Sequence, residues 1–77
     1  MPTLLAQEGF KFFFYANEHM PLHVHVTRGG GYAKIDLATL AVSDRHLRPA
    51  DASRAVAIAR EHQAEFIRRW YEFFPSR

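Results

Sequence analysis

The chain contains no cysteine, and this absence excludes two kinds of structure. Disulfide bonds cannot form, and a zinc site cannot be built on thiolates. Any bound metal must therefore take nitrogen and oxygen ligands. A chain without cysteine also fits a reducing compartment, and we expect a cytoplasmic protein.

Long apolar runs are missing as well. Charged and polar side chains such as Lys11, Asn17, Arg28 and Asp36 interrupt the apolar residues. No stretch therefore reaches the length of about 20 residues that a membrane helix needs. The apolar stretch at the N-terminus is interrupted by Glu8 and is too short for an export signal. We therefore expect no targeting segment and no membrane partner.

Charge of one sign is not in excess. Ten Lys and Arg residues stand against eight Asp and Glu residues, and the formal net charge is +2. Most of the cations are arginine, whose planar guanidinium suits bidentate contact with phosphate or carboxylate. An RNA or an acidic protein partner is compatible with this composition, but so small a net charge does not require one.

The 77 residues are enough for one small domain, which we expect to span 1–77 around a modest core. Its first strand is expected over 9–16, where nearly all residues are aromatic or apolar, as in a strand buried on both faces. Alternation of apolar and polar residues predicts half-buried strands over 22–28 and 31–37, joined by a glycine turn. A short fourth strand is expected over 40–43.

A C-terminal helix is expected over 52–73, with Asp51 or Ser53 as its N-cap. Apolar positions recur along it at steps of three and four, and they form one stripe. The stripe consists of Ala55, Ala59, His62, Phe66, Trp70 and Phe73. The predicted fold is therefore α+β, a small antiparallel β-meander of three to four strands packed against one C-terminal α-helix.

One helix covers only one face of a sheet. In the first strand Phe10, Phe12 and Phe14 should point to one face, whereas Phe13 and Tyr15 should point to the other. Monomeric soluble proteins rarely leave a large apolar patch uncovered. We therefore expect a homo-oligomer, in the simplest case a homodimer, or a protein partner that buries the second face.

The strongest chemical signal is a group of histidines. His19, His23 and His25 are three of the five histidines of the chain, and they lie within seven positions. His23 and His25 are two residues apart on a predicted strand, so both rings should leave one face with Cα atoms roughly 7 Å apart. His19 can bend in from the preceding turn. Because histidine titrates near neutral pH and binds metals through either ring nitrogen, several chemistries remain open.

One interpretation is a metal site. His19, His23 and His25 would hold zinc or another divalent transition metal and leave a fourth position for a water nucleophile. A second interpretation needs no metal, because two imidazoles can act as base and acid on an RNA 2′-hydroxyl and its leaving oxygen. The phosphate would then be held by a nearby cation, either Arg28 or Lys34, with Arg45 and Arg48 as further candidates. A third interpretation is that the histidines are structural or binding residues without catalytic function.

His62 is a further candidate for the site, and its place depends on the helix. If the helix packs on the face of Val24 and Val26, His62 lies away from His23 and His25. If the helix packs on the histidine face, His62 completes a site of four imidazoles. A hydrogen-bonded core histidine is the third alternative.

The chain also resembles a bacterial family catalogued as domain of unknown function 4160, whose members share an HxPPHxHx segment after an aromatic strand. The resemblance covers nearly the whole chain. It rests on His19, Pro21, His23 and His25 in that segment, on 33–37 in the next strand, and on His62, Glu65 and Trp70 in the helix. Leu22 stands where the family usually has a second proline, so we expect a looser turn here.

The resemblance implies a function. Genes of this family often sit beside a gene for a second small protein, and some pairs are regarded as toxin-antitoxin modules in which the histidine protein resembles the toxin. It thus implies a toxin neutralised by a cognate small antitoxin-like protein. If such a toxin is an enzyme, the histidine cluster favours a histidine-dependent hydrolase or ribonuclease, with or without a metal. The alternative is a non-enzymatic protein-interaction module or metal-binding protein.

Overall fold

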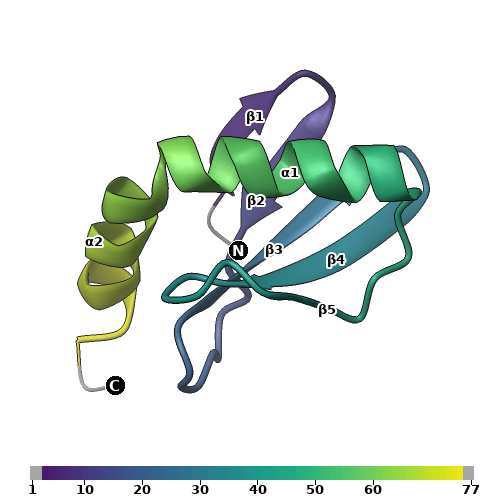
Figure 1. The fold of residues 1–77 in the computed structure, drawn as a ribbon. Coiled ribbons are helices and arrows are strands. Elements are labelled where there is room, and N and C mark those ends of the chain that lie inside the picture. Colours follow the sequence, from purple (N-terminus) through teal and green to yellow (C-terminus); the bar gives the residue numbers. More distant parts are fainter. Residues whose placement is uncertain (1–2, 76–77) are drawn as a thin grey trace.

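The computed structural model describes residues 3–75. Within this range the chain forms an antiparallel sheet of five strands in the order β1-β2-β3-β4-β5, followed by two helices (Figure 1). The elements are β1 (Thr3–Gln7), β2 (Phe10–Phe13), β3 (His23–Arg28), β4 (Gly31–Asp36), β5 (Val42–Ser43), α1 (Pro49–Glu61) and α2 (Gln63–Phe73). The predicted α+β meander is confirmed, but the predicted three to four strands and single helix are wrong.

The additional strand is β1 at the N-terminal end. It pairs with β2 through a two-residue reversal at Glu8 and Gly9, which both have positive φ angles (56° and 82°). Positive φ at both central residues is the geometry of a type I′ hairpin turn, and glycine at the second position adopts it without strain. The sequence did not reveal β1 because its residues, TLLAQ, lack a clear alternation of apolar and polar side chains.

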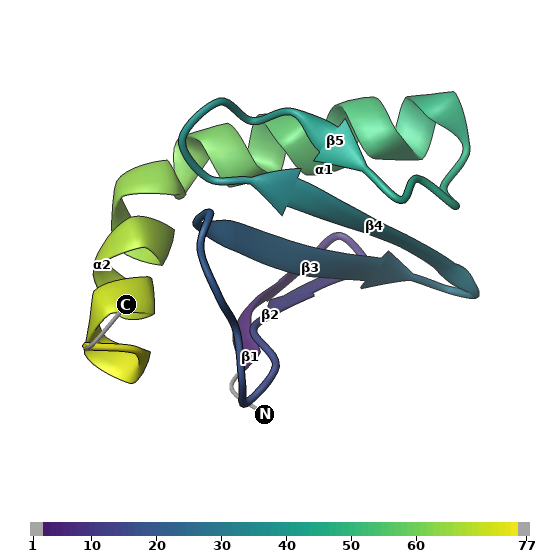
Figure 2. The ribbon, with the colours of Figure 1, turned by 90° about the horizontal axis from the view of Figure 1, so that it is seen from below.

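The helix predicted over 52–73 is divided at His62, whose backbone (φ −111°, ψ 14°) leaves the helical region. The apolar stripe continues across this break, so periodicity alone could not reveal it. The Gln63 side chain donates a hydrogen bond to the carbonyl oxygen of Leu37 at 2.6 Å, which attaches the start of α2 to the end of β4. Figure 2 shows that α2 turns away from the axis of α1 beside the end of the sheet.

The predicted N-cap is also wrong. Helix α1 begins earlier, with Pro49 at its first position and Arg48 as an N-cap that makes no side-chain capping hydrogen bond. Proline suits this position because its fixed φ is helical and its missing N–H would have no partner inside the helix. Asp51 therefore lies in the first turn, where a carboxylate is favoured by the helix dipole.

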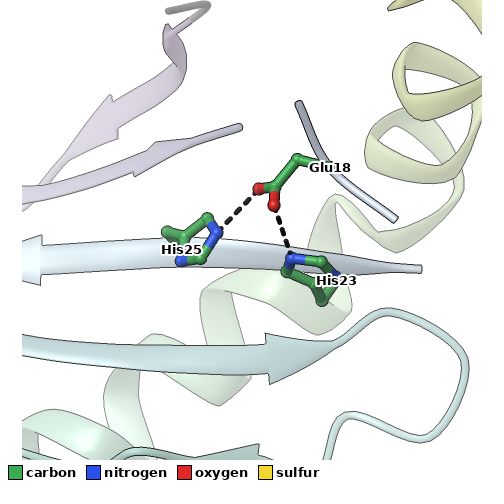
Figure 3. A group of neighbouring side chains, drawn as sticks. All are labelled: Glu18, His23 and His25. Carbon is green, nitrogen blue, oxygen red and sulfur yellow. Dashed lines mark hydrogen bonds and ion pairs between the residues drawn. The ribbon is translucent and has the colours of Figure 1, made fainter. Parts of the chain in front are cut away.

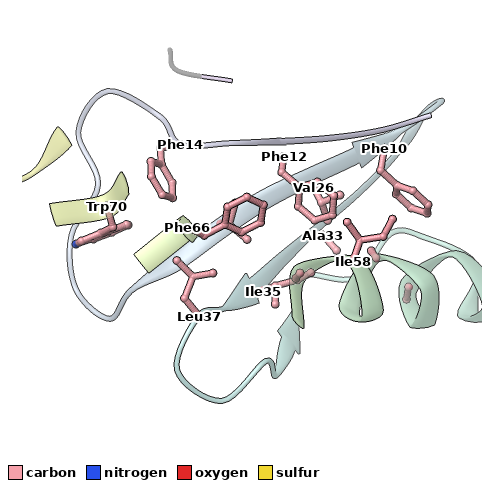
Figure 4. Packing of buried hydrophobic residues seen from close by; sticks show 14 of the residues in the cluster. Phe10, Phe12, Phe14, Val26, Ala33, Ile35, Leu37, Ile58, Phe66 and Trp70 are labelled. Carbon is pink, nitrogen blue, oxygen red and sulfur yellow. The ribbon is translucent and has the colours of Figure 1, made fainter. Parts of the chain in front are cut away.

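The core lies between the helices and one face of the sheet (Figure 4). Val24, Val26 and Ile35 are fully buried there with Ile58 of α1 and Phe66 of α2. The helices therefore pack on the valine face, which decides between the two alternatives left open by the sequence. Because side chains alternate along a strand, His23 and His25 point to the opposite face.

The histidine face is partly covered by the chain itself. Phe13 lies on this face but is only 5% exposed. Its ring stacks on His25 with centroids 5.5 Å apart, and it meets the edge of Tyr15 at 5.3 Å. Tyr15 remains 46% exposed. Phe13 is therefore buried without an outside partner, whereas the homo-oligomer or protein partner expected to cover this face stays a prediction.

Over residues 3–75, neither α1 nor α2 combines the length and the apolar composition of a membrane-spanning helix.

Candidate functional site

The candidate site is a carboxylate held between two imidazoles (Figure 3). His23 and His25 come from alternate positions of β3, and Glu18 comes from the loop between β2 and β3. One carboxylate oxygen of Glu18, Oε1, lies 3.0 Å from Nε2 of His23, and the other, Oε2, lies 2.7 Å from Nε2 of His25. Among residues 3–75, these three side chains form the group of potential metal ligands, with donor atoms all within 4.8 Å of one another.

The loop positions Glu18 through a local hydrogen bond. The backbone N–H of Tyr15 donates to Glu18 Oε2 at 3.1 Å. The side chain is directed inward, and the residue is only 7% exposed. A buried carboxylate requires partners of this kind, because an unpaired charge away from water is costly.

The outer nitrogens of both rings are fixed by further partners. His23 Nδ1 lies 2.7 Å from the carbonyl oxygen of Pro21, and His25 Nδ1 lies 2.8 Å from the hydroxyl oxygen of Tyr32. A carbonyl only accepts, so His23 Nδ1 carries a proton and donates it. Both rings therefore turn Nε2 inward toward Glu18, in an orientation that their second nitrogens hold.

The electrostatics of the site favour an ionised carboxylate. Burial by itself would raise the pKa of Glu18, but the Tyr15 N–H and the two histidines outweigh it, and the pKa lies below its ordinary value. Burial lowers the pKa of His25 below its ordinary value, although Glu18 acts in the opposite direction. The arrangement is that of a neutral His25 donating its Nε2–H to an anionic Glu18.

Aromatic rings surround the two imidazoles and limit their motion. The His25 ring lies 4.4 Å from that of Tyr15 and stacks on that of Tyr32 at 5.9 Å. The His23 ring lies 5.3 Å from Trp70, which reaches the site from α2. Trp70 is completely buried, and its indole Nε1 has no hydrogen-bond partner among the described residues. Helix α2 therefore packs against the site through the contact of Trp70 with His23.

Glu18, His23 and His25, the candidate triad, border a pocket of about 430 Å³. Its wall adds Lys34 and Asp36 of β4 to the triad, together with Asn17, His19, Met20, Pro21 and Ser43. Lys34 lies directly opposite His25 in the β3–β4 register. The lining therefore carries one cation, Lys34, and two carboxylates, Glu18 and Asp36, and Lys34 lies 4.0 Å from a carboxylate oxygen of Asp44. Together with the hydrogen-bonding groups, this composition suits a polar ligand.

The structure brings together only some of the residues predicted from the sequence. His23 and His25 converge, and Lys34 lies beside them. His19 lines the pocket, but it is exposed and does not belong to the group of converging donor atoms. His62 lies at the junction of the helices, where its ring stacks on Phe66 and its Nδ1 lies 3.7 Å from a carboxylate oxygen of Glu65. The proposed site of four imidazoles is therefore not formed.

The other predicted cations lie elsewhere. Arg28 is at the far end of β3, where it donates to the carbonyl of Glu8 at 3.2 Å and lies 3.6 Å from the carboxylate of Asp51. Arg48 also faces Asp51, at 3.8 Å. Arg45 donates to the carbonyl of Leu47. Lys34 is thus the one predicted phosphate contact that lines the pocket of the triad.

Sequence reasoning missed Glu18 and Tyr32. Glu18 precedes His19 directly, and a carboxylate beside a histidine cluster is a signal that could have identified it, since metal and proton-transfer sites often combine the two. Tyr32 lies on the same face as the histidines by alternation along β4, so its hydroxyl could have been placed near them from the expected hairpin.

Comparison with known proteins agrees with the resemblance found in the sequence. No curated protein and no solved structure matched the chain. One family model matched residues 9–71, which include β2 to β5, α1, the candidate triad and all but the last two residues of α2. The chain belongs to the family described as Domain of unknown function (DUF4160).

Proposed function

We propose that this protein is the toxin component of a bacterial toxin-antitoxin module and that it acts on RNA through Glu18, His23 and His25. The observation that supports this most is the convergence of one carboxylate and two imidazoles at the base of an open pocket. A structural role alone would not require an opening to solvent at that point. Perturbed titratable groups in a cleft are typical of active sites.

An RNA phosphodiester is the ligand that we infer for the pocket. Lys34 supplies a positive charge beside the triad, and His19 and Asn17 offer hydrogen-bonding groups at its wall. In cleavage, the attacking oxygen forms a bond to phosphorus and gives up its proton, while the bond to the leaving ribose oxygen breaks and that oxygen gains a proton. For His23 or His25 to assist either proton transfer, its Nε2 must first leave Glu18. Lys34 would offset part of the phosphate charge.

Growth arrest tests this proposal. Induced expression of the protein should stop growth of a bacterial host, and the double variant His23→Ala, His25→Ala should remove that effect. The matched control is His62→Ala, because His62 lies away from the pocket. It should still arrest growth. Full arrest by the double variant, at equal protein level, would refute a catalytic function for the cluster.

Two further measurements define substrate and partner. Total RNA from arrested cells should contain cleavage fragments that are absent with the double variant. Co-expression of the small protein encoded beside the gene should restore growth, as expected for a cognate antitoxin. Arrest with intact RNA would exclude RNA as the substrate.

A second candidate is a non-enzymatic interaction module, and exposed aromatic and apolar residues favour it. Tyr15, Met20, Tyr71 and Phe73 are between 43% and 54% exposed. Two of them flank the site in the chain, and two lie on α2. Binding of the neighbouring gene product that is lost in Met20→Asp or Phe73→Asp, without any arrest of growth, would support this function. A homodimer through the same residues stays a prediction, and sedimentation analysis tests it.

A further inference from the structure

We propose that Glu18, His23 and His25 bind one divalent transition-metal ion, with Zn²⁺ as the ion to test first. This ligand set differs from the three histidines expected from the sequence, because Glu18 replaces His19. Two imidazole nitrogens and one carboxylate oxygen are a donor set that zinc and other first-row metals accept. The inference concerns the site of the proposed function, and its catalytic consequence rests on that function.

The distances already approach those of a metal centre. Zinc binds imidazole nitrogen and carboxylate oxygen at about 2.0–2.2 Å, so two ligands of one ion lie about 3–3.5 Å apart. The Nε2 atoms of His23 and His25 lie 3.0 and 2.7 Å from the carboxylate oxygens of Glu18. The three donor atoms all lie within 4.8 Å of one another, so we infer that small rotations of these side chains bring them to the separations that one ion needs.

The outer hydrogen bonds are those that orient metal ligands. A metal-bound histidine commonly donates its second ring N–H to a backbone carbonyl, a carboxylate or another oxygen. His23 has the carbonyl oxygen of Pro21 at its Nδ1. In the metal-free site the Nδ1 of His25 accepts from the Tyr32 hydroxyl, and a metal at Nε2 would move the ring proton to Nδ1, where the Tyr32 oxygen can accept it. Each Nε2 is thus left to face the common centre.

The inward ring nitrogens of the two histidines and the carboxylate oxygens of Glu18 already contact one another. Nε2 of each ring lies against an oxygen of Glu18, so neither imidazole presents a free inward nitrogen to a substrate. Metal-free catalysis by these histidines would first have to break the contacts that build the site. A cation would instead take the position on which all three groups already converge.

The three protein ligands would leave a coordination position of the ion open toward the pocket. Three protein ligands occupy one side of the ion, and the pocket lies on the other side. Water or a phosphate oxygen would complete the coordination from there, as in zinc hydrolases with two histidines and one glutamate. With neutral imidazoles and one carboxylate, a divalent ion would keep one positive charge. Lys34 and Asp36 beside the pocket offset each other, so the ion itself would attract an anionic substrate.

Direct binding of zinc tests the inference. Untagged protein should bind one Zn²⁺ per chain in isothermal titration calorimetry, and the bound metal should persist in elemental analysis after gel filtration. Glu18→Gln and His25→Ala should each weaken binding at least 100-fold. His19→Ala should bind as the native protein does, because His19 is outside the donor group. Loss of binding in His19→Ala with retention in Glu18→Gln would overturn the assignment of ligands.

Tyr32→Phe keeps the three ligands and removes only the hydroxyl that orients His25. Loss of such an outer hydrogen bond typically weakens metal affinity about 10- to 100-fold, so this variant should bind more weakly but with unchanged stoichiometry. Because variants of buried ligands can fail to fold, circular dichroism of each metal-free variant is measured first. Native protein supplies an independent readout, since Co²⁺ added in place of zinc should produce visible absorption bands typical of nitrogen and oxygen coordination.

The two proposals can fail separately. Zinc binding without growth arrest would leave the metal site and remove the toxin function. Growth arrest by a folded protein that binds neither Zn²⁺ nor Co²⁺ at millimolar concentration would overturn the metal site and leave the proposed function.

Discussion

At the scale of single residues, the site depends on a loop glutamate as much as on the strand histidines. Alternation along a strand is a local property, so the shared face of His23 and His25 could be predicted from sequence. The position of Glu18 could not, because it depends on the path of the loop that leads from Tyr15 to Pro21. In the sequence His19 looked equivalent to His23 and His25, but the path of the loop leaves it outside the triad.

Gly31 shows the same dependence on tertiary packing. A Cβ atom placed there would overlap the side chain of Leu47 and lie 3.0 Å from the carbonyl oxygen of His46, whereas a Cβ at Gly30 would meet nothing within 4 Å. We therefore expect Gly31→Ala to lower the free energy of unfolding by about 1–3 kcal/mol. Gly30→Ala should be nearly neutral. Urea unfolding of the two variants measures the difference, and equal loss in both would contradict this packing argument.

At the scale of elements, the sequence predicted β3 and β4 well and β1 and the helix break poorly. β3 and β4 have a strict alternation that persists whatever they pack against. β1 becomes a strand by pairing with β2, with an irregular register between Thr3 and Leu5. The break at His62 occurs where α2 turns beside the end of the sheet, and no local signal in the sequence marks it.

The hairpin of β1 and β2 is attached to α1 by an ion pair with a predictable pH dependence. Arg54 donates two hydrogen bonds to the carboxylate of Glu8, and this contact lowers the pKa of Glu8 to about 2. A carboxyl whose pKa is lower in the folded state stabilises the fold above its unfolded pKa and loses that effect as the pH falls through the folded value.

Glu8→Gln should therefore be less stable than the native protein at pH 6, and the difference should decline between pH 4.5 and about 2. Because the pair is exposed to solvent, high salt should also reduce the difference. Thermal unfolding at several pH values and two salt concentrations provides the measurement. A difference that stays constant down to pH 2 would show that charge is not its cause.

At the scale of the whole molecule, the sequence could state the alternatives for the sheet faces but could not choose between them. Apolar residues occupied both faces of the first strand, and the stripe of the helix could have packed on either. The helices pack on the face where Val24, Val26 and Ile35 form a continuous apolar surface. On the other face, His25 and Lys34 interrupt such a surface.

Phe66 joins α2 to the sheet and should report on this packing. Its ring is buried and lies 5.6 Å from that of Phe12. Phe66→Ala should lower the free energy of unfolding by about 3–5 kcal/mol, the usual cost of removing a buried aromatic ring. Phe73→Ala on the same helix is the control, because Phe73 is 43% exposed and should cost far less. Similar losses would mean that α2 does not pack as described.

The two sides of β3 link the formation of the core to the formation of the candidate site. Val24 and Val26 fill the core, and His23 and His25, one residue out of phase, build the site. A shift of the strand by one residue would exchange the two sets of side chains. The imidazoles would then lie among the phenylalanines of the core, and the valines would lie in the pocket. A misaligned chain would therefore lose both its core packing and its triad, so that the triad comes together only in the strand alignment that also completes the core.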